Sequence, residues 1–237
     1  MTRLRSLLFA GWLYLISAPL AVLYSVLLLL PRQAMMAGMR FWAGLMLFGL
    51  RWLTGVRIEV RGLEHRPTGA ALIAAKHMGM LDTIAPFVFL PDVCFVLKKE
   101  LLAIPFYGWH AQKARMIAVD REAHARALKD LVAAARDRLR ETRQIIIYPE
   151  GTRKAPGDPP DYKPGVAGLY RDLGLPCTPM ATNSGAHWPA HGFLRRPGVV
   201  VFEFLPPIPA GLKRADFMRE LQDRIETASA ALLAERI

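Results

Sequence analysis

The chain has 237 residues, a formal net charge of +11, two cysteines and 53% hydrophobic residues. This length allows one well-buried domain and an additional segment, and the apolar content is higher than soluble domains usually show. Cys94 and Cys177 stand in apolar runs without metal-ligand spacing, which argues against a zinc site or a disulfide framework and favours a reducing compartment. The basic charge suggests a polyanionic partner: nucleic acid, anionic lipid or phosphorylated substrates.

The first apolar segment lies at the amino terminus, where residues 7–30 carry no charge. As a helix, this run is long enough to cross a bilayer core of ~30 Å. A secretory signal peptide is the competing interpretation, because Arg3 and Arg5 give the chain a basic start. The run exceeds the ~7–15 apolar residues of a signal peptide and no small-residue cleavage site follows it. We therefore expect a membrane helix that is retained.

A second apolar stretch spans residues 35–55. Arg40 and Arg51 interrupt it and leave uncharged runs that are too short to span a membrane. We expect a helix that lies in the membrane interface, with Trp42 and Trp52 at the level of the headgroups. The alternative is a buried helix of the domain core.

The positive charges predict how the two apolar segments are arranged. A single spanning helix that leads into a cytosolic domain would place Arg3 and Arg5 outside, against the positive-inside tendency. A hairpin keeps most of the flanking arginines on the cytosolic side and leaves only Arg32 and Arg40 near the bend. We therefore expect residues 1–55 to form a membrane-anchoring helical hairpin in one leaflet, on the cytosolic side of the membrane. The arginines kept on that side are Arg3, Arg5, Arg51, Arg57 and Arg61.

From residue 56 onward, short apolar runs alternate with longer amphipathic ones. Short apolar runs bounded by turn formers are typical of strands that are buried on both faces of a sheet. Their alternation with helices predicts an α/β domain over residues 56–237, with a mostly parallel sheet flanked by helices. The clearest helices are 122–142, which has an apolar stripe, and 214–236. The expected strands are 57–60, 71–75, 94–97, 116–119, 145–148, 178–181 and 199–204.

The sequence KHMGMLD, residues 76–82, directly follows an expected strand and has a histidine five positions before an aspartate. In open α/β sheets, ligands bind beyond the carboxyl ends of the strands. A tight loop at that place brings Asp82 to one ring nitrogen of His77 and leaves the other nitrogen free as a base. A pair at this spacing also arises by chance in a chain with six histidines, so the spacing alone does not decide.

Two further strand ends carry charged residues. The sequence YPEGTRK, residues 148–154, contains Gly151, which allows a close backbone approach, and Arg153, whose planar fork suits phosphate. The sequence AVDR ends in Asp120 and Arg121. Taken alone, the first segment is explained equally well as a surface turn, and Arg121 is explained better as part of an ion pair at a helix start.

Taken in order, HxxxxD, the DR pair, PEGTR and a strand centred on Pro179 resemble the four sequence blocks of the glycerolipid acyltransferases, and most of all their bacterial 1-acyl-glycerol-3-phosphate acyltransferases. The resemblance extends over nearly the whole chain, including VLKKELLAIPFYGW at 96–109 and KPG at 163–165. It implies the fold of these acyltransferases. It also implies transfer of an acyl group from acyl-CoA or acyl carrier protein to the sn-2 hydroxyl of lysophosphatidic acid, giving phosphatidic acid.

The resemblance also implies roles for individual residues. His77 becomes the base, Asp82 its orienting partner, and Pro179 shapes the acyl-donor side. The residues implied for the acceptor phosphate are Arg121, Glu150, Gly151, Thr152, Arg153 and either Lys98 or Lys99. No metal is implied, and the thioester is a co-substrate rather than a cofactor. The sequence agrees, since it has no GxSxG elbow, Walker loop or clustered metal ligands.

Four positions depart from the family pattern. Lys76 stands where asparagine is common, Gly79 where serine is common, Ala118 in place of an aromatic residue, and Tyr148 in place of phenylalanine. None belongs to the dyad, but the acceptor stays open, because related enzymes acylate lysolipids with other head groups, such as lyso-ornithine lipid.

Two other functions remain as alternatives. One is a lipid hydrolase that uses the same dyad on water, and the other is a membrane-anchored basic binding protein. Membrane lipids are the expected partner, and nucleic acid is not, because the basic helix 122–142 lacks interleaved aromatic residues.

Overall fold

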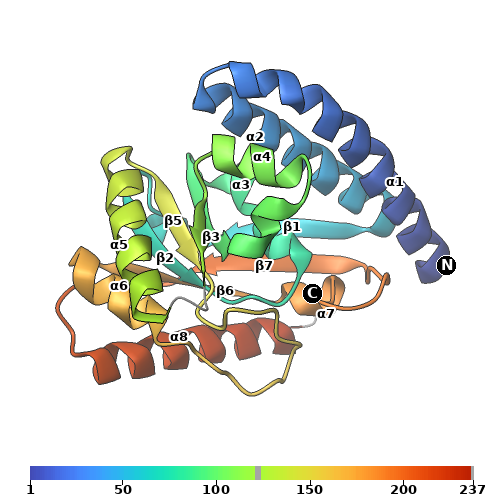
Figure 1. The fold of residues 1–237 in the computed structure, drawn as a ribbon. Helices are drawn as coiled ribbons and strands as arrows, with labels where there is room; N and C mark the ends of the chain where they lie inside the picture. The colour runs from blue at the N-terminus through green and yellow to red at the C-terminus, as the bar shows by residue number, and fades with distance from the viewer. Residues whose placement is uncertain (121–123, 236–237) are drawn as a thin grey trace.

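A seven-stranded sheet runs through the parts of the chain that the computed structural model describes, residues 1–120 and 124–235 (Figure 1). The strand order is β1-β7-β6-β2-β5-β3-β4, and neighbouring strands are parallel except for the antiparallel pair β6 and β7. The strands are β1 (Val56–Arg61), β2 (Ala71–Ala75), β3 (Val93–Lys98), β4 (Ile117–Val119), β5 (Gln144–Ile147), β6 (Cys177–Thr182) and β7 (Gly198–Phe204). Each expected strand is present, and the ends differ by no more than one residue.

Helices cover both faces of the sheet (Figure 1). Strand β2 shows why, because alternate side chains of this fully apolar strand point to opposite faces. Leu72 and Ala74 pack into a core with α5, α6 and α8, whereas Ile73 and Ala75 pack into a core with α1 and α2. The helices are α1 (Thr2–Leu23), α2 (Arg32–Gly49), α3 (Pro86–Phe89), α4 (Tyr107–Lys113), α5 (His124–Arg140), α6 (Gly165–Leu173), α7 (Ser184–His187) and α8 (Arg214–Ala234).

The expected helices correspond to α5 and α8, although residues 122 and 123 lie outside the described ranges. Helices α4 and α6 were not anticipated, because each is short. Helix α6 begins at Gly165, the last residue of the KPG sequence at 163–165.

Helices α1 and α2 pack side by side as an antiparallel hairpin, with a 3-10 helix (Tyr24–Leu29) before the bend (Figure 1). Trp12 Nε1 donates a hydrogen bond to the Leu45 carbonyl at 3.1 Å, and Trp42 Nε1 donates to Ser17 Oγ at 2.9 Å. A Cβ added to Gly49 would stand 2.3 Å from the indole nitrogen of Trp12. This close contact between the two arms therefore requires a glycine on α2. The expected hairpin therefore forms through specific contacts between its two arms.

One face of the hairpin belongs to the core of the α/β unit. Phe9 of α1 and Met35, Ala43 and Met46 of α2 are buried against the sheet. One face of the second apolar stretch is thus buried, as in a core helix. Trp52 near its end is 65% exposed. The division of the chain at residue 55 into an anchoring unit and an acyltransferase domain stays a prediction.

The two arginines near the bend bind the α/β unit. Arg32 forms an ion pair with Asp92 at 2.7 Å, and the same carboxylate contacts the buried Arg143 at 3.2 Å. Arg40 donates to the Phe87 carbonyl at 3.1 Å. Both arginines therefore have partners in the α/β unit. These contacts hold the hairpin bend near the end of the sheet where β3 and β5 begin.

The outer face of the hairpin is apolar and exposed. Within the described residues, one helical stretch, Thr2–Leu29, is long and apolar enough to cross a membrane, with a mean hydropathy of 2.0. The exposed apolar side chains on both arms include Leu4, Leu7, Leu8, Tyr14, Leu15, Val22, Leu23, Val26, Phe41, Phe48 and Trp52. This surface is suited to contact with lipid.

Candidate active site

The centre of the site is a tight loop between β2 and α3 that holds His77 and Asp82 together. Asp82 lies in a 3-10 turn (Met80–Thr83), and its side chain is 1% exposed. Its Oδ2 accepts three hydrogen bonds: from His77 Nδ1 at 3.0 Å, from Met78 N at 2.7 Å and from Gly79 N at 2.8 Å. One carboxylate oxygen therefore organises both the histidine and the loop that carries it.

The dyad geometry places Nδ1 of His77 against the Asp82 carboxylate. A neutral imidazole that donates from Nδ1 to an ionised carboxylate keeps the lone pair on Nε2. Among the described residues Nε2 has no hydrogen-bond partner, and the side chain is 15% exposed. His77 is thus a histidine that is fixed on one side and accessible on the other, as a general base requires.

Tyr148 supports the imidazole from one face. Its ring stacks on His77 with 4.2 Å between centroids and 23° between planes, and its hydroxyl donates to the Asp82 carbonyl at 2.6 Å. Burial, and next the charge of Asp82, raises the pKa of the Tyr148 phenol well above its usual value. Tyr148 therefore stays neutral and serves as a rigid support for the dyad.

The loop that carries His77 and Asp82 also packs on the segment after α7. A Cβ at Gly79 would stand 2.4 Å from the backbone oxygen of Trp188, so only glycine fits this contact. Trp188 in turn meets Phe9 of the hairpin edge-to-face, with 5.2 Å between ring centroids, and the Arg195 guanidinium lies 4.2 Å from its ring centroid. Trp188 therefore lies between the dyad loop and the apolar hairpin and contacts both.

Glu150 joins the end of β5 to the dyad. Its side chain is fully buried, and its Oε2 accepts from the His77 backbone N–H at 3.1 Å. Its Oε1 forms an ion pair with Lys76 Nζ at 2.7 Å, and Lys76 is itself only 3% exposed. Burial raises the pKa of the Glu150 carboxyl, while the hydrogen bond and charge of Lys76 act in the opposite direction.

The rest of the PEGTR segment turns outward. Gly151 has a φ of 67°, a left-handed conformation that glycine adopts without strain, and its N–H donates to the Tyr148 carbonyl at 3.0 Å. Thr152 and Arg153 are exposed. Within the described chain the Arg153 guanidinium has no ion-pair or hydrogen-bond partner, so its five donors are available to an anion.

No hydrogen bond or ion pair joins the dyad to the remaining predicted site residues that the structure describes, which are Lys98, Lys99 and Pro179. Lys98 is the last residue of β3 and Lys99 follows it, and their exposed side chains pair with Glu100 at 3.3 Å and Asp120 at 3.1 Å. Pro179 is buried inside β6, opposite Ala74 of β2. Arg121 lies outside the described residues.

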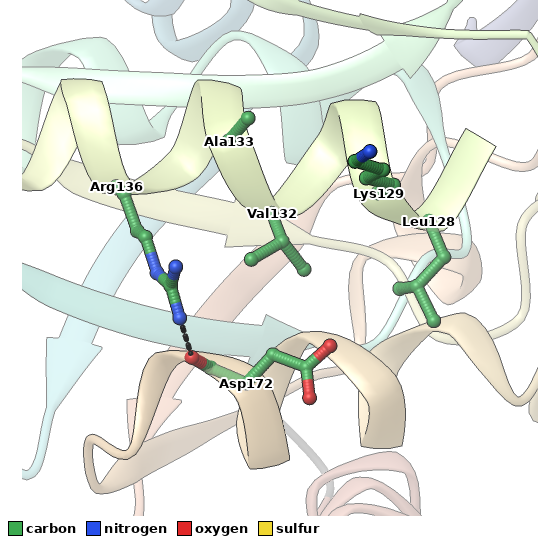
Figure 2. A pocket seen from close by; sticks show the side chains of 6 residues that line it. All are labelled: Leu128, Lys129, Val132, Ala133, Arg136 and Asp172. Carbon is green, nitrogen blue, oxygen red and sulfur yellow. Dashed lines mark hydrogen bonds between the residues drawn. The ribbon is translucent and has the colours of Figure 1, made fainter. Parts of the chain in front are cut away.

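A separate hollow of about 490 Å³ lies between α5 and α6 (Figure 2). It is lined by Leu128, Lys129, Val132, Ala133, Arg136 and Asp172, none of which is a predicted site residue. Arg136 crosses it to donate to the Asp172 carbonyl at 2.7 Å. Nowhere in the described ranges do three His, Cys, Asp or Glu side chains form a group that could hold a metal ion.

Three residues of the site were missed as functional candidates. Lys76 and Tyr148 were noted only as departures from the family pattern, and Glu226 of α8 was not noted at all. Glu226 contacts Lys76 at 2.8 Å across 150 positions of the chain. A lysine directly between an apolar strand and the histidine was the available signal, since a buried lysine needs an acidic partner.

Comparisons with known proteins found a family model and several relatives that this chain matches. Residues 57–183 match the family model described as acyltransferase. The chain is 33% identical over 194 residues to the 1-acyl-sn-glycerol-3-phosphate acyltransferase of Pseudomonas aeruginosa. The aligned region covers 82% of this chain and 76% of the relative. The enzyme of the same name from Helicobacter pylori is 31% identical over 180 residues, or 73% of each chain.

The fold itself is similar to a solved structure. The crystal structure of the 1-acyl-sn-glycerophosphate acyltransferase from Thermotoga maritima matches with a TM-score of 0.82 over 100% of both chains, at 20% identity. A likeness at this level of identity establishes the α/β architecture with its amino-terminal helices, and the chemistry has to be argued from the residues of this chain.

Proposed function

The chain belongs to the acyltransferase family, and from this premise we propose that it transfers an acyl group from a thioester to the sn-2 hydroxyl of 1-acyl-glycerol-3-phosphate. The product would be phosphatidic acid for phospholipid synthesis. The observation that carries the proposal is the His77–Asp82 pair, in which a buried carboxylate holds Nδ1 and leaves Nε2 accessible. The names of the relatives from Pseudomonas and Helicobacter support the choice of acceptor.

The proposed chemistry needs little beyond this base. Nε2 of His77 takes the proton of the acceptor hydroxyl while the hydroxyl oxygen attacks the thioester carbonyl carbon. The C–S bond then breaks, and the thiolate leaves, which is favourable because thiol pKa values lie near ~8.5. Asp82 stabilises the imidazolium that forms, and the imidazolium returns its proton to the departing sulfur or to water. The products are an ester and a free thiol.

The acceptor phosphate is proposed to bind at the outer part of the same edge. Arg153 supports this role, because its guanidinium is exposed and its planar fork matches a phosphate group. Arg121, Gly151 and Thr152 complete the proposed subsite together with Glu150, and Lys98 or Lys99 adds positive charge. Pro179 is proposed to shape the acyl-donor side from within β6, and the donor is acyl-CoA or acyl carrier protein.

The hairpin is proposed to place this site at the membrane surface, on the cytoplasmic side of the inner membrane. The exposed apolar face of α1 and α2 supports insertion, and the contact of Phe9 with Trp188 supports a position of the dyad loop beside the inserted hairpin. An acceptor with one acyl chain in the bilayer would then present its hydroxyl to His77 without leaving the membrane. In this proposal residues 1–55 anchor the chain and residues 56–237 carry out the chemistry.

A thioester-consumption assay tests the proposal. Purified protein in lipid vesicles is given acyl-CoA, or acyl carrier protein charged with the same chain, with and without lysophosphatidic acid. Thiol release that requires the acceptor supports transfer, release without it identifies a hydrolase, and no release with either donor leaves a binding protein. A panel of lysolipids with other head groups, including lyso-ornithine lipid, then decides the acceptor.

A further inference from the structure

We propose that Lys76 and Glu226 are positioning residues for His77, through which helix α8 holds the dyad loop in its reactive geometry. The inference rests on the proposed role of His77 as the base. It assigns a function to two members of a buried ion cluster, Lys76 and Glu226, that the transfer chemistry itself does not use.

The cluster uses every donor of the lysine. Lys76 Nζ contacts Glu150 Oε1 at 2.7 Å, Glu226 Oε1 at 2.8 Å and Glu226 Oε2 at 2.9 Å. Tyr162 donates its hydroxyl to Glu226 Oε1 at 2.8 Å. The ammonium therefore links three separate segments: the end of β2, the loop after β5, and α8.

Glu150 passes this link on to the dyad. One of its oxygens accepts from Lys76 and the other from the backbone N–H of His77. Because Lys76 is the residue before His77, the histidine is held through its own N–H and through its neighbour's side chain. The His77 carbonyl is also fixed, since it accepts from Lys154 N at 2.8 Å.

Charge makes Lys76 necessary for this arrangement. Lys76 and Glu150 are 3% and 0% exposed, and the second carboxylate, Glu226, is 27% exposed. Without the ammonium, Glu150 and Glu226 would face each other as like charges in a poorly solvated site, and a buried carboxylate without a partner moves or takes up a proton. Either change would loosen the hydrogen bond to His77 N.

A purely structural role predicts something different. Buried ion pairs can often be replaced by apolar residues with little loss of stability, so retention of the charge for stability alone is not expected. A positioning role predicts that turnover falls while substrate affinities hold, because Lys76 and Glu226 orient the base and belong to neither proposed substrate subsite. A displacement of ~1 Å in a reacting group can lower the rate by ~10²-fold.

The experiment compares four variants of the full chain in the thioester assay with lysophosphatidic acid. Lys76→Met removes the ammonium, and Glu226→Gln keeps the shape of its partner while removing the charge. Lys76→Met combined with Glu150→Gln removes both buried charges and leaves an amide oxygen for His77 N. Glu220→Gln is the matched control on α8, where Glu220 pairs with Arg224 at the surface.

We expect kcat of Lys76→Met to fall by ~10–100-fold with unchanged KM for donor and acceptor. Glu226→Gln should lower kcat by a smaller factor at an unchanged Tm, Glu220→Gln should match the wild type, and the double variant should regain part of the kcat that Lys76→Met loses. If Lys76→Met does not fold, the kcat of Glu226→Gln still tests the proposal, because Glu226 is partly exposed and its substitution should leave the protein folded.

Wild-type kcat in Glu226→Gln and, where it folds, in Lys76→Met overturns the proposal. So does a double variant that recovers Tm without recovering kcat. A wild-type protein without acceptor-dependent thiol release contradicts the proposed function instead, so the two failures are distinguishable.

Discussion

A methyl group added to the dyad loop should disable the site without touching the dyad. In the Gly79→Ala variant the new Cβ would stand 2.4 Å from the Trp188 backbone oxygen. Ordinary C···O contacts are about 3.3 Å or longer, so the loop or its neighbour must move by about 0.9 Å. Trp188 has little freedom to yield, because the atom in contact belongs to the backbone and its ring is held by Phe9 and Arg195.

The consequence follows from the hydrogen bond that Gly79 donates. Its N–H lies 2.8 Å from Asp82 Oδ2, and a shift of about 0.9 Å takes that bond beyond hydrogen-bonding distance. The loss of a hydrogen bond to a buried charge should lower the free energy of unfolding by about 1.5–3 kcal/mol. Misplacement of His77 by a similar distance should lower kcat by ~10²-fold.

Thiol release measures kcat, and thermal unfolding measures stability. The control is Gly69→Ala, because Gly69 precedes β2, the strand that leads into the dyad loop, and a Cβ there meets nothing within 4 Å. Gly69→Ala should retain wild-type kcat and stability. A Gly79→Ala protein that behaves like this control in both measurements would refute the argument from steric contact.

Three further predictions concern phosphate, thiols and topology. Arg153→Lys keeps the charge but loses the two-pronged geometry, so KM for lysophosphatidic acid should rise more than KM for acyl-CoA; a rise confined to the donor would reverse the two subsites. Burial raises the pKa of the Cys94 thiol and raises that of Cys177 to about 12. Alkylation at pH 8 should therefore leave both thiols unmodified in the native protein and modify both after denaturation, and rapid native labelling would show that the core opens. With those thiols silent, a Thr2→Cys variant in intact cells should resist an impermeant reagent until the cells are opened; ready labelling from outside would rule out the one-leaflet hairpin.

The parts of this fold that depend on local pattern could be predicted from the sequence. The central strands were found because they are short runs that are buried on both faces of the sheet, as in β2, β5 and β6. The contact of His77 with Asp82 could also be anticipated, since a strand end followed by a tight loop leaves few arrangements for a pair five residues apart. The short helix α6 was missed, because an amphipathic pattern over nine residues is weak.

The parts that depend on distant contacts could not be read from the sequence. Nothing local to Glu226 indicates that it meets Lys76, because the pair is created by the packing of α8 against the sheet. The hydrophobic pattern of residues 35–55 likewise does not reveal that one face of α2 packs on the sheet, since an inserted helix and a core helix both need apolar residues. The match of Arg32 with Asp92 follows from that packing as well.

The most direct test of the account is the turnover of His77→Ala with acyl-CoA and lysophosphatidic acid. Without the imidazole, Asp82 Oδ2 still accepts from Met78 N and Gly79 N, so the loop should keep its fold and the variant should unfold at close to the wild-type temperature. Its kcat should fall by the ~10²–10⁴-fold that is typical of a lost general base. A folded His77→Ala protein with near-normal acceptor-dependent thiol release would contradict the assignment of His77 as the base.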